Sequence, residues 1–487
     1  MQRVRRLKDA LYTKRGLQKQ DTYHSSKRGY VHMVKDRNFY KTIFRISLPA
    51  AFSSLVSFLV VVADDIMVSY IGSGVSAQSA VSQINALTAF FTATVTGLVS
   101  GSSVLIAQYW GKKDMERIKR IFSMVFLISV GVSLLFCLAA LLFPDGIIRL
   151  ILKGDGSDVT ALARDYFTLV CFSYIPFAIT SALTGMLRSV EVVRVTLYVS
   201  IASLFANIGF NYIFIFGKLG LPEMGVRGAA LATLLTRVIE TAIVWFYTFR
   251  VQNVLDVKPR QLVSFDRVLF KDYARYGLPV GFTDMQWALV GLLKAAIIGQ
   301  MATAFISANA ITNAMMNLGT MFTFALAGGA CVVVGKAVGK GDINTAKEYS
   351  KTIQIMFAVI GVIMAALVFA LRKPFTALYH SAEDPEVYKL SILMIAIGAV
   401  TLMGTSYHAS CFVGINRGAG DSRFVAKVDM ICGWLIVLPA MLLSAVVFHM
   451  PGPIVFLASR IDQCFKWIIA FFRLRGDKWI QNVTRND

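Results

Sequence analysis

One acidic side chain in the first long apolar segment has the chemistry of an ion-binding group. Asp64 lies late in that segment, and an ionisable side chain within a membrane-length apolar run is costly enough to be a functional hypothesis. Asn207 and Asn211, in a later apolar segment, are four residues apart and share one helix face. Thr233 follows in the next segment. Counting from the segment ends, all four oxygen-bearing side chains reach a similar depth.

A carboxylate with amide and hydroxyl oxygens around it can bind either of two small cations. It can hold a proton, because removal from water favours the neutral acid. It can also coordinate a hard cation such as sodium through its oxygens. Sodium at Asp64 is the only metal ion that the sequence predicts, and no cofactor is expected. The alternative for Asn207 and Asn211 is that they only tie helices together.

The composition shows which elements must position these groups. Of 487 residues, 56% are hydrophobic and 16% charged, against about 25% charged in soluble proteins. Mean hydropathy is +0.62. These values exclude a soluble enzyme, a disordered chain and a coiled coil. A membrane-crossing helix needs about 20 apolar residues. We therefore expect an all-α integral membrane protein with twelve spans, at 43–70, 76–110, 121–143, 162–187, 193–216, 226–249, 276–299, 305–335, 352–371, 388–415, 424–448 and 453–472.

The net charge of +21 is distributed as a membrane protein requires. Most of the 49 lysines and arginines fall in alternate loops and in the two terminal segments. The positive-inside rule then places both termini in the cytoplasm. Basic charge facing anionic membrane lipids explains the net charge without a nucleic-acid partner. The prediction is a multi-pass protein of a cytoplasmic membrane, most simply a bacterial one.

Three pairs of markers indicate that the chain repeats itself. Leu48-Pro49 recurs as Leu278-Pro279, 230 residues later, and the turn before Asp114 recurs before Asp342, 228 residues later. Arg237 with Glu240 in span six corresponds to Arg460 with Asp462 in span twelve, and both pairs are expected to be interhelical ion pairs. The predicted organisation is a basic cytoplasmic arm 1–42, six-span halves 43–250 and 272–475, a cytoplasmic linker 251–271 and a cytoplasmic tail 476–487.

The repeat also indicates the kind of function. Six spans per half make the repeat parallel, with a central cavity between the halves, which is typical of a transporter. A channel would need a pore ring, and the short outer loops offer no reactive constellation for an enzyme. We therefore predict a non-enzymatic transporter that needs no oligomer.

Two further positions follow from comparing the halves. Fifteen residues after Pro49 stands Asp64, and fifteen residues after Pro279 stands Lys294. Lys294 could repel a cation, contact acidic substrate groups, extend outward to the membrane surface or pair with Asp284, which is about 15 Å away along one helix. Pro49 either kinks the helix that carries Asp64 or marks a helix start.

These features resemble the MATE family, the multidrug and toxic compound extrusion transporters of the multidrug/oligosaccharidyl-lipid/polysaccharide exporter superfamily. The resemblance runs from about Ile43 to Arg475. The stretches that carry it are Leu48-Pro49 with Ala63-Asp64-Asp65-Ile66-Met67, Ala107–Asp114, Leu187-Arg188-Ser189, Asn207-x-x-x-Asn211 with Ile215-Phe216-Gly217, Gly225–Thr233 and Arg417-Gly418-Ala419-Gly420-Asp421.

The resemblance implies a V-shaped pair of six-helix lobes that exports organic cations in exchange for sodium or protons. It implies a cation site at Asp64, Asn207, Asn211 and Thr233, and it links Pro49 to helix bending. The acidic pair that some branches carry in the second lobe falls here on Trp287 and Ser406, so a cation site of that kind is not expected. Trp287 joins Lys294 and Asp284 as possible cavity or substrate residues.

The sequence therefore predicts a multidrug efflux antiporter that gives drug resistance by exporting amphipathic, cationic small molecules in exchange for H⁺ or Na⁺. A flippase for lipid-linked precursors, of the same superfamily, is the alternative, and a basic central cavity would favour it. A polytopic membrane transferase would need carboxylate or histidine motifs at a membrane face. A structural or receptor-like membrane protein would be indifferent to the substitution Asp64→Asn.

Overall fold

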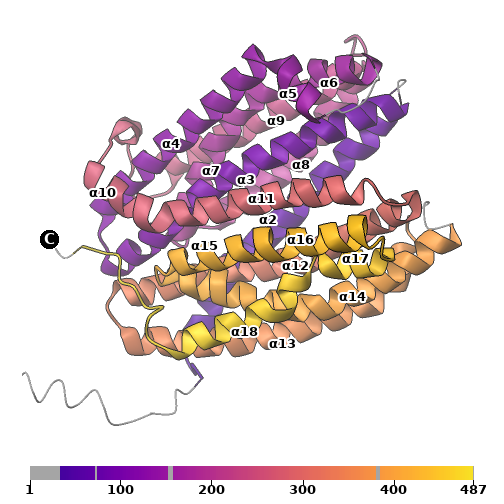
Figure 1. Ribbon diagram of the computed structural model, residues 1–487. Helices are drawn as coiled ribbons and strands as arrows, with labels where there is room; N and C mark the ends of the chain where they lie inside the picture. The colour runs from indigo at the N-terminus through magenta and orange to yellow at the C-terminus, as the bar shows by residue number, and fades with distance from the viewer. Residues whose placement is uncertain (1–32, 72–73, 152–156, 380–383, 486–487) are drawn as a thin grey trace, which may run out of the picture.

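The computed structural model describes residues 33–71, 74–151, 157–379 and 384–485, and every regular element in these ranges is helical (Figure 1). Most of the expected arm 1–42 lies outside them. The first half contains α2 (Arg37–Ser69), α3 (Gly74–Lys112), α4 (Met115–Leu142), α5 (Pro144–Ile151), α6 (Ser157–Val170), α7 (Tyr174–Ser189), α8 (Arg194–Ile215) and α9 (Gly225–Phe246). The second contains α10 (Arg267–Asp272), α11 (Leu278–Ile298), α12 (Thr303–Gly339), α13 (Ile343–Thr376), α14 (Pro385–Ala409), α15 (Ser422–Met430), α16 (Leu438–Leu442), α17 (Gly452–Ala458) and α18 (Ile461–Arg475).

Ten helical segments in the described ranges are long and apolar enough to cross a membrane. Two less apolar segments complete the predicted twelve. One is α11, whose hydropathy is lowered by Asp284, Gln286 and Lys294. The other is the pair α17 and α18, which is interrupted at Ser459 and Arg460. The all-α, twelve-helix prediction is confirmed.

The first span begins earlier than the hydropathy predicts. α2 starts at Arg37, six residues before the expected boundary at 43. The reason is a local capping interaction: Asp36 is extended, and its side chain accepts a hydrogen bond of 2.8 Å from the N–H of Asn38. An aspartate in this position satisfies one of the free N–H groups at a helix start. The boundary is therefore set by a cap and not by the onset of apolar residues.

The repeated turns have the same backbone geometry in both halves. Lys113 has φ +60° and Gly341 has φ +77°. Asp114 then caps α4 by accepting from the N–H of Arg117 at 3.0 Å, and Asp342 caps α13 by accepting from the N–H of Thr345, also at 3.0 Å. Hydrogen bonds from the hydroxyl and N–H of Thr345 lower the pKa of Asp342 below its ordinary value. The sequence repeat is thus a structural repeat.

The two halves form two layers of helices that meet at one end of the bundle (Figure 1). We call this the linker end, because residues 252–266, which join the halves, lie there with the turns at Asp114 and Asp342. Glycines bring the backbones together at this end. A Cβ on Gly101 of α3 would lie 2.3 Å from the carbonyl oxygen of Gly277, just before α11. A Cβ on Gly339 of α12 would lie 1.9 Å from the carbonyl oxygen of Gln108.

The chain after α18, predicted as a cytoplasmic tail at 476–487, is packed against the rest of the protein. Through residue 485 it packs along the linker end, with Trp479 1% exposed and Val483 6% exposed. Arg485 pairs with Asp272 of the second half, at 2.8 Å, while its carbonyl oxygen accepts hydrogen bonds from two basic side chains of the first half. The basic composition of this segment gave no indication that Trp479 and Val483 would be buried.

Gln108 of α3 joins this segment to both halves. Its side chain is fully buried; it accepts from the N–H of Val483 at 2.8 Å and donates to the carbonyls of Gly418 and Gln481 at 3.1 and 3.2 Å. We expect Gln108→Ala to lower the free energy of unfolding by about 2–4 kcal/mol, because it leaves buried groups unpaired. Thermal unfolding of the purified protein in detergent measures this. Asn482→Ala, at the surface of the same segment, is the control. Equal stabilities of the two variants would contradict the expectation.

Candidate ion and substrate sites

The structure brings three of the four predicted oxygen-bearing side chains together. α2 packs against α8. There the side-chain amide of Asn211 donates hydrogen bonds to the carboxylate of Asp64 and, at 3.3 Å, to the side-chain oxygen of Asn207. Asn207 and Asn211 are 1% and 0% exposed, on the one helix face that their spacing predicts. A carboxylate from one helix is therefore held by a buried amide pair from another.

One acceptor in this cluster is unused. The side-chain oxygen of Asn211 is buried and has no hydrogen-bond partner within the described ranges. An amide oxygen close to a carboxylate suits either a proton shared with the neutral acid or a sodium ion coordinated by oxygens. The residues present thus fit a transported H⁺ or Na⁺, and the donor set does not distinguish between them.

Thr233 stands apart from this chain of hydrogen bonds. Its hydroxyl donates to the carbonyl of Ala229 in its own helix, at 3.0 Å. Pro49 lies in the interior of α2, so the helix-start interpretation of this proline is wrong. A proline inside a helix removes one backbone hydrogen bond, here the one that the carbonyl of Arg45 would accept. The helix that carries Asp64 therefore lacks one backbone hydrogen bond at Pro49, and it can bend there more easily than elsewhere.

The polar face of α8 extends one turn beyond the predicted pair. Ser203, four residues before Asn207, is buried and donates to the carboxylate of Glu240 in α9. Glu240 in turn pairs with Arg237 at 2.8 Å. The expected interhelical pair is wrong, because Arg237 and Glu240 are three residues apart on one helix. The four-residue spacing of Ser203, Asn207 and Asn211 is the signal that could have identified Ser203 from the sequence.

Lys294, Asp284 and Trp287 all line one cavity in the second half, with a volume of about 480 Å³. Lys294 does not pair with Asp284; its ammonium donates to the carbonyl of Ser459 at 2.8 Å. Asp284 instead pairs with Arg417 at 2.8 Å. The predicted cavity residues do share a cavity, but their partners come from two different segments, the break between α17 and α18 and the turn before α15.

The same cavity contains a buried charge triad that sequence reasoning missed. Lys466 of α18, 2% exposed, lies 2.7 Å from Asp429 and 3.0 Å from Asp462. Its ammonium is 4.4 Å from the centre of the Trp287 ring. The expected pair of Arg460 with Asp462 is wrong, because Arg460 donates to the hydroxyl of Thr401 instead. These residues come from α11, α14, α15 and α18. Asp462 and Lys466 are four residues apart on α18, a spacing that could have indicated their pair, but no spacing within one segment links them to Asp429.

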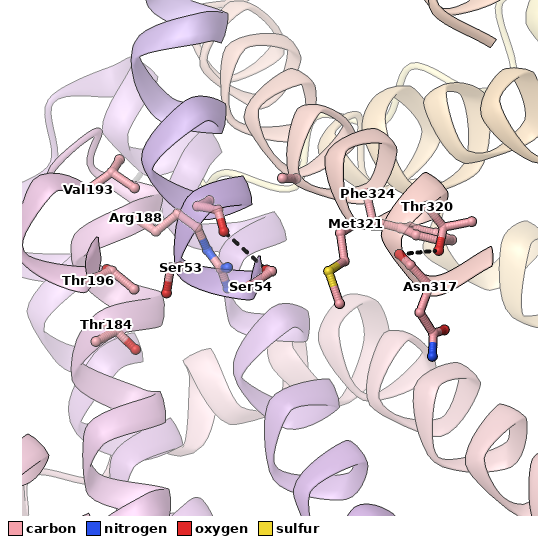
Figure 2. A pocket seen from close by; sticks show the side chains of 12 residues that line it. Ser53, Ser54, Thr184, Arg188, Val193, Thr196, Asn317, Thr320, Met321 and Phe324 are labelled. Carbon is pink, nitrogen blue, oxygen red and sulfur yellow. Dashed lines mark hydrogen bonds between the residues drawn. The ribbon is translucent and has the colours of Figure 1, made fainter. Parts of the chain in front are cut away.

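A second cavity, of about 380 Å³, lies between the two halves, with α2, α7 and α8 on one side and α12 on the other (Figure 2). Its lining is mostly polar, and Arg188 is the single charged residue among the described residues that line it. The other polar side chains are Ser53, Ser54, Thr184, Thr196, Asn317 and Thr320. An apolar pocket of about 160 Å³ adjoins it at Met321, between α2 and α12, and is lined by Leu48, Phe52 and Leu55 among others.

Comparison with known proteins identifies the fold family. The family model MatE matches residues 49–213 and again residues 279–473. The chain belongs to the MatE family. The two matches begin at Pro49 and Pro279, the prolines that mark the internal repeat, so the family model finds the same two halves. The predicted relationship to multidrug and toxic compound extrusion transporters is confirmed.

Curated relatives and solved structures of MatE-family type cover most of the chain. The probable multidrug resistance protein NorM of Halalkalibacterium halodurans is 26% identical over 71% of this chain and 74% of its own length. The uncharacterized transporter YisQ of Bacillus subtilis is 23% identical over 86% of this chain and 90% of its own length. A multidrug resistance MATE transporter of the MOP superfamily, solved in an outward-facing conformation, has TM-score 0.80 at 20% identity, covering 93% of this chain and 100% of its own. The eukaryotic transporter AtDTX14 has TM-score 0.78 at 19% identity, covering 92% and 97%.

Proposed function

We propose that this chain is a secondary active multidrug efflux antiporter, which exports amphipathic small molecules, organic cations among them, in exchange for H⁺ or Na⁺. The observation that carries the proposal is the Asp64 carboxylate held by Asn211 beside an unused amide oxygen. The multidrug resistance relatives and the cavity between two repeated halves support it. In this proposal the protein resides in the cytoplasmic membrane with both termini inside, needs no oligomer and is not an enzyme.

Coupling requires that the ion bind one conformation better than the other. With the linker end on the cytoplasmic side, the described arrangement is closed towards the cytoplasm, because the glycine contacts of α3 with α11 and α12 lie there. An external cation that reaches Asp64 neutralises its charge and changes its hydrogen bond with Asn211. The interior Pro49 lets α2 bend between this site and the linker end. Ion binding then favours return to the inward-facing state, in which the next substrate enters.

Dye export by the purified protein in liposomes tests this function. The proton gradient and the sodium gradient are imposed separately, and ethidium is the transported probe. The expected result is ethidium movement against its own gradient under one of the two ion gradients, which then identifies the coupling ion. Folded protein that moves ethidium under neither gradient would contradict the proposal.

A further inference from the structure

The internal repeat extends to individual residues of the two cavities. Leu48 to Ser54 reads Leu-Pro-Ala-Ala-Phe-Ser-Ser, and Leu278 to Asp284 reads Leu-Pro-Val-Gly-Phe-Thr-Asp. Leucine, proline and phenylalanine coincide at the same offset of 230, and serine corresponds to threonine. Ser54 is therefore the counterpart of Asp284. Ser54 lines the cavity between the halves, and Asp284 lines the cavity of the second half.

The arginine that pairs with Asp284 has a counterpart as well. Arg417 follows α14, Arg188 lies near the end of α7, and they are 229 residues apart. Three residues after each arginine the backbone has a positive φ, +67° at Glu191 and +87° at Gly420. A turn of the same kind thus follows an arginine at the equivalent position of each half.

The two arginines differ in what they face. Arg417 pairs with Asp284 at 2.8 Å. Arg188 faces Ser54, whose hydroxyl donates to the carbonyl of Ala50 in its own helix (Figure 2). Within the described ranges the guanidinium of Arg188 makes no ion pair or hydrogen bond. The first half therefore has the arginine of this repeated pair without its carboxylate.

We propose that Arg188 binds a carboxylate of the transported compound, in the place that Asp284 occupies beside Arg417. The proposal rests on the antiporter function above and names its substrate class: amphipathic anions and zwitterions with one carboxylate. A guanidinium and a carboxylate form two parallel, charge-assisted hydrogen bonds, and a partly dry cavity strengthens them. The side-chain amide of Asn317 lines the same cavity as a further donor.

The surroundings of Arg188 fix the rest of the ligand. Among the residues that the structure describes, one cation and no acidic residue line the cavity, so one carboxylate neutralises it. A lipid-linked diphosphate brings more charge than one arginine compensates. The adjoining apolar pocket, with Leu48, Phe52 and Leu55, provides a place for an apolar body. A zwitterion combines this carboxylate with the cationic group that the sequence analysis predicts for substrates.

A pair of dyes that differ only in the carboxylate tests the assignment. The probes are a rhodamine with a free carboxylic acid and the methyl ester of the same rhodamine, and affinity is measured by fluorescence anisotropy with purified protein in detergent. We expect the wild type to bind the acid about tenfold or more tightly than the ester, which corresponds to one charge-assisted hydrogen-bonded pair. Arg188→Gln should bind the acid as weakly as the ester.

A substitution in α2 separates ligand contact from a purely structural role of the arginine. Ser54→Asp restores the carboxylate that the second half has at Asp284, so it should occupy Arg188 and abolish the preference for the acid. Ser54→Asn, of the same size and neutral, should keep it. Equal binding of acid and ester by the wild type would overturn the proposal, as would an acid preference that survives in both Arg188→Gln and Ser54→Asp.

Two further results separate this proposal from the function on which it rests. Ethidium has no carboxylate, so gradient-driven ethidium export by the wild type reports the antiporter function without the contact to Arg188. Ethidium export without discrimination between acid and ester would contradict the role of Arg188 and leave the antiporter intact. Displacement of the acid dye by a lipid-linked diphosphate, but not by a simple amphipathic carboxylate, would overturn both proposals in favour of a flippase.

Discussion

Asp64→Asn should reduce gradient-driven ethidium export to the rate of protein-free liposomes. Asparagine keeps the size of the side chain and a hydrogen bond with Asn211, but it has no negative charge to neutralise. A site that binds no cation gives the ion gradient no state to favour. The measurement is dye movement in proteoliposomes under the gradient that drives the wild type.

Binding and fold must be intact for this result to be informative. Ethidium affinity in detergent should stay close to that of the wild type, because Asp64 does not line either of the two substrate cavities. Asp145→Asn, an exposed carboxylate at the opposite end of the bundle from the linker, is the matched control and should export normally. Wild-type export by Asp64→Asn under either gradient would exclude Asp64 as the coupling group.

Lys466→Met should destabilise the protein by about 3–5 kcal/mol, because it leaves the carboxylates of Asp429 and Asp462 buried without their shared cation. Asp462 is 1% exposed and Asp429 6% exposed, so the two carboxylates have little contact with bulk water once the ammonium is removed. Thermal unfolding in detergent and the yield of monodisperse protein both report this loss. Lys427→Met, on the exposed side of α15, should have little effect.

A compensating variant separates charge from packing in this triad. Combining Lys466→Met with Asp429→Asn and Asp462→Asn removes all three charges, and most of the lost stability should return. Neutral replacement of a whole buried ion network is tolerated far better than removal of one partner. If the triple variant is as unstable as Lys466→Met alone, the side-chain volume of lysine and its contact with Trp287 matter more than its charge.

Local patterns predicted most of the fold and part of the site. The twelve spans follow from hydropathy, and the two halves follow from Pro49, Pro279 and the capped turns at Asp114 and Asp342. Asn207 and Asn211 share a face because four residues make about one helical turn. Each of these predictions depends on residues close together in the chain, or on a pattern that the chain repeats.

What the sequence did not predict depends on contacts between distant segments. The triad around Lys466 joins α15 to α18, and Asp284 reaches Arg417 across more than a hundred residues. The packing of Trp479 against the linker end is likewise set by partners from both halves. Hydropathy also does not reveal which of the two repeated arginines lacks its acid; aligning the two halves at their Leu-Pro pairs places Ser54 opposite Asp284.

The glycine contacts at the linker end have a mechanical consequence. Gly97 and Gly101 of α3 meet Gly281 and Gly277 backbone to backbone. Side chains packed between two helices would have to change rotamer whenever the helices rotate against each other, and such a contact resists rotation. Two glycine backbones in contact have no side chains that must change rotamer. The glycine contact between the halves therefore allows the two rigid bodies to rotate relative to each other while their own interiors stay packed.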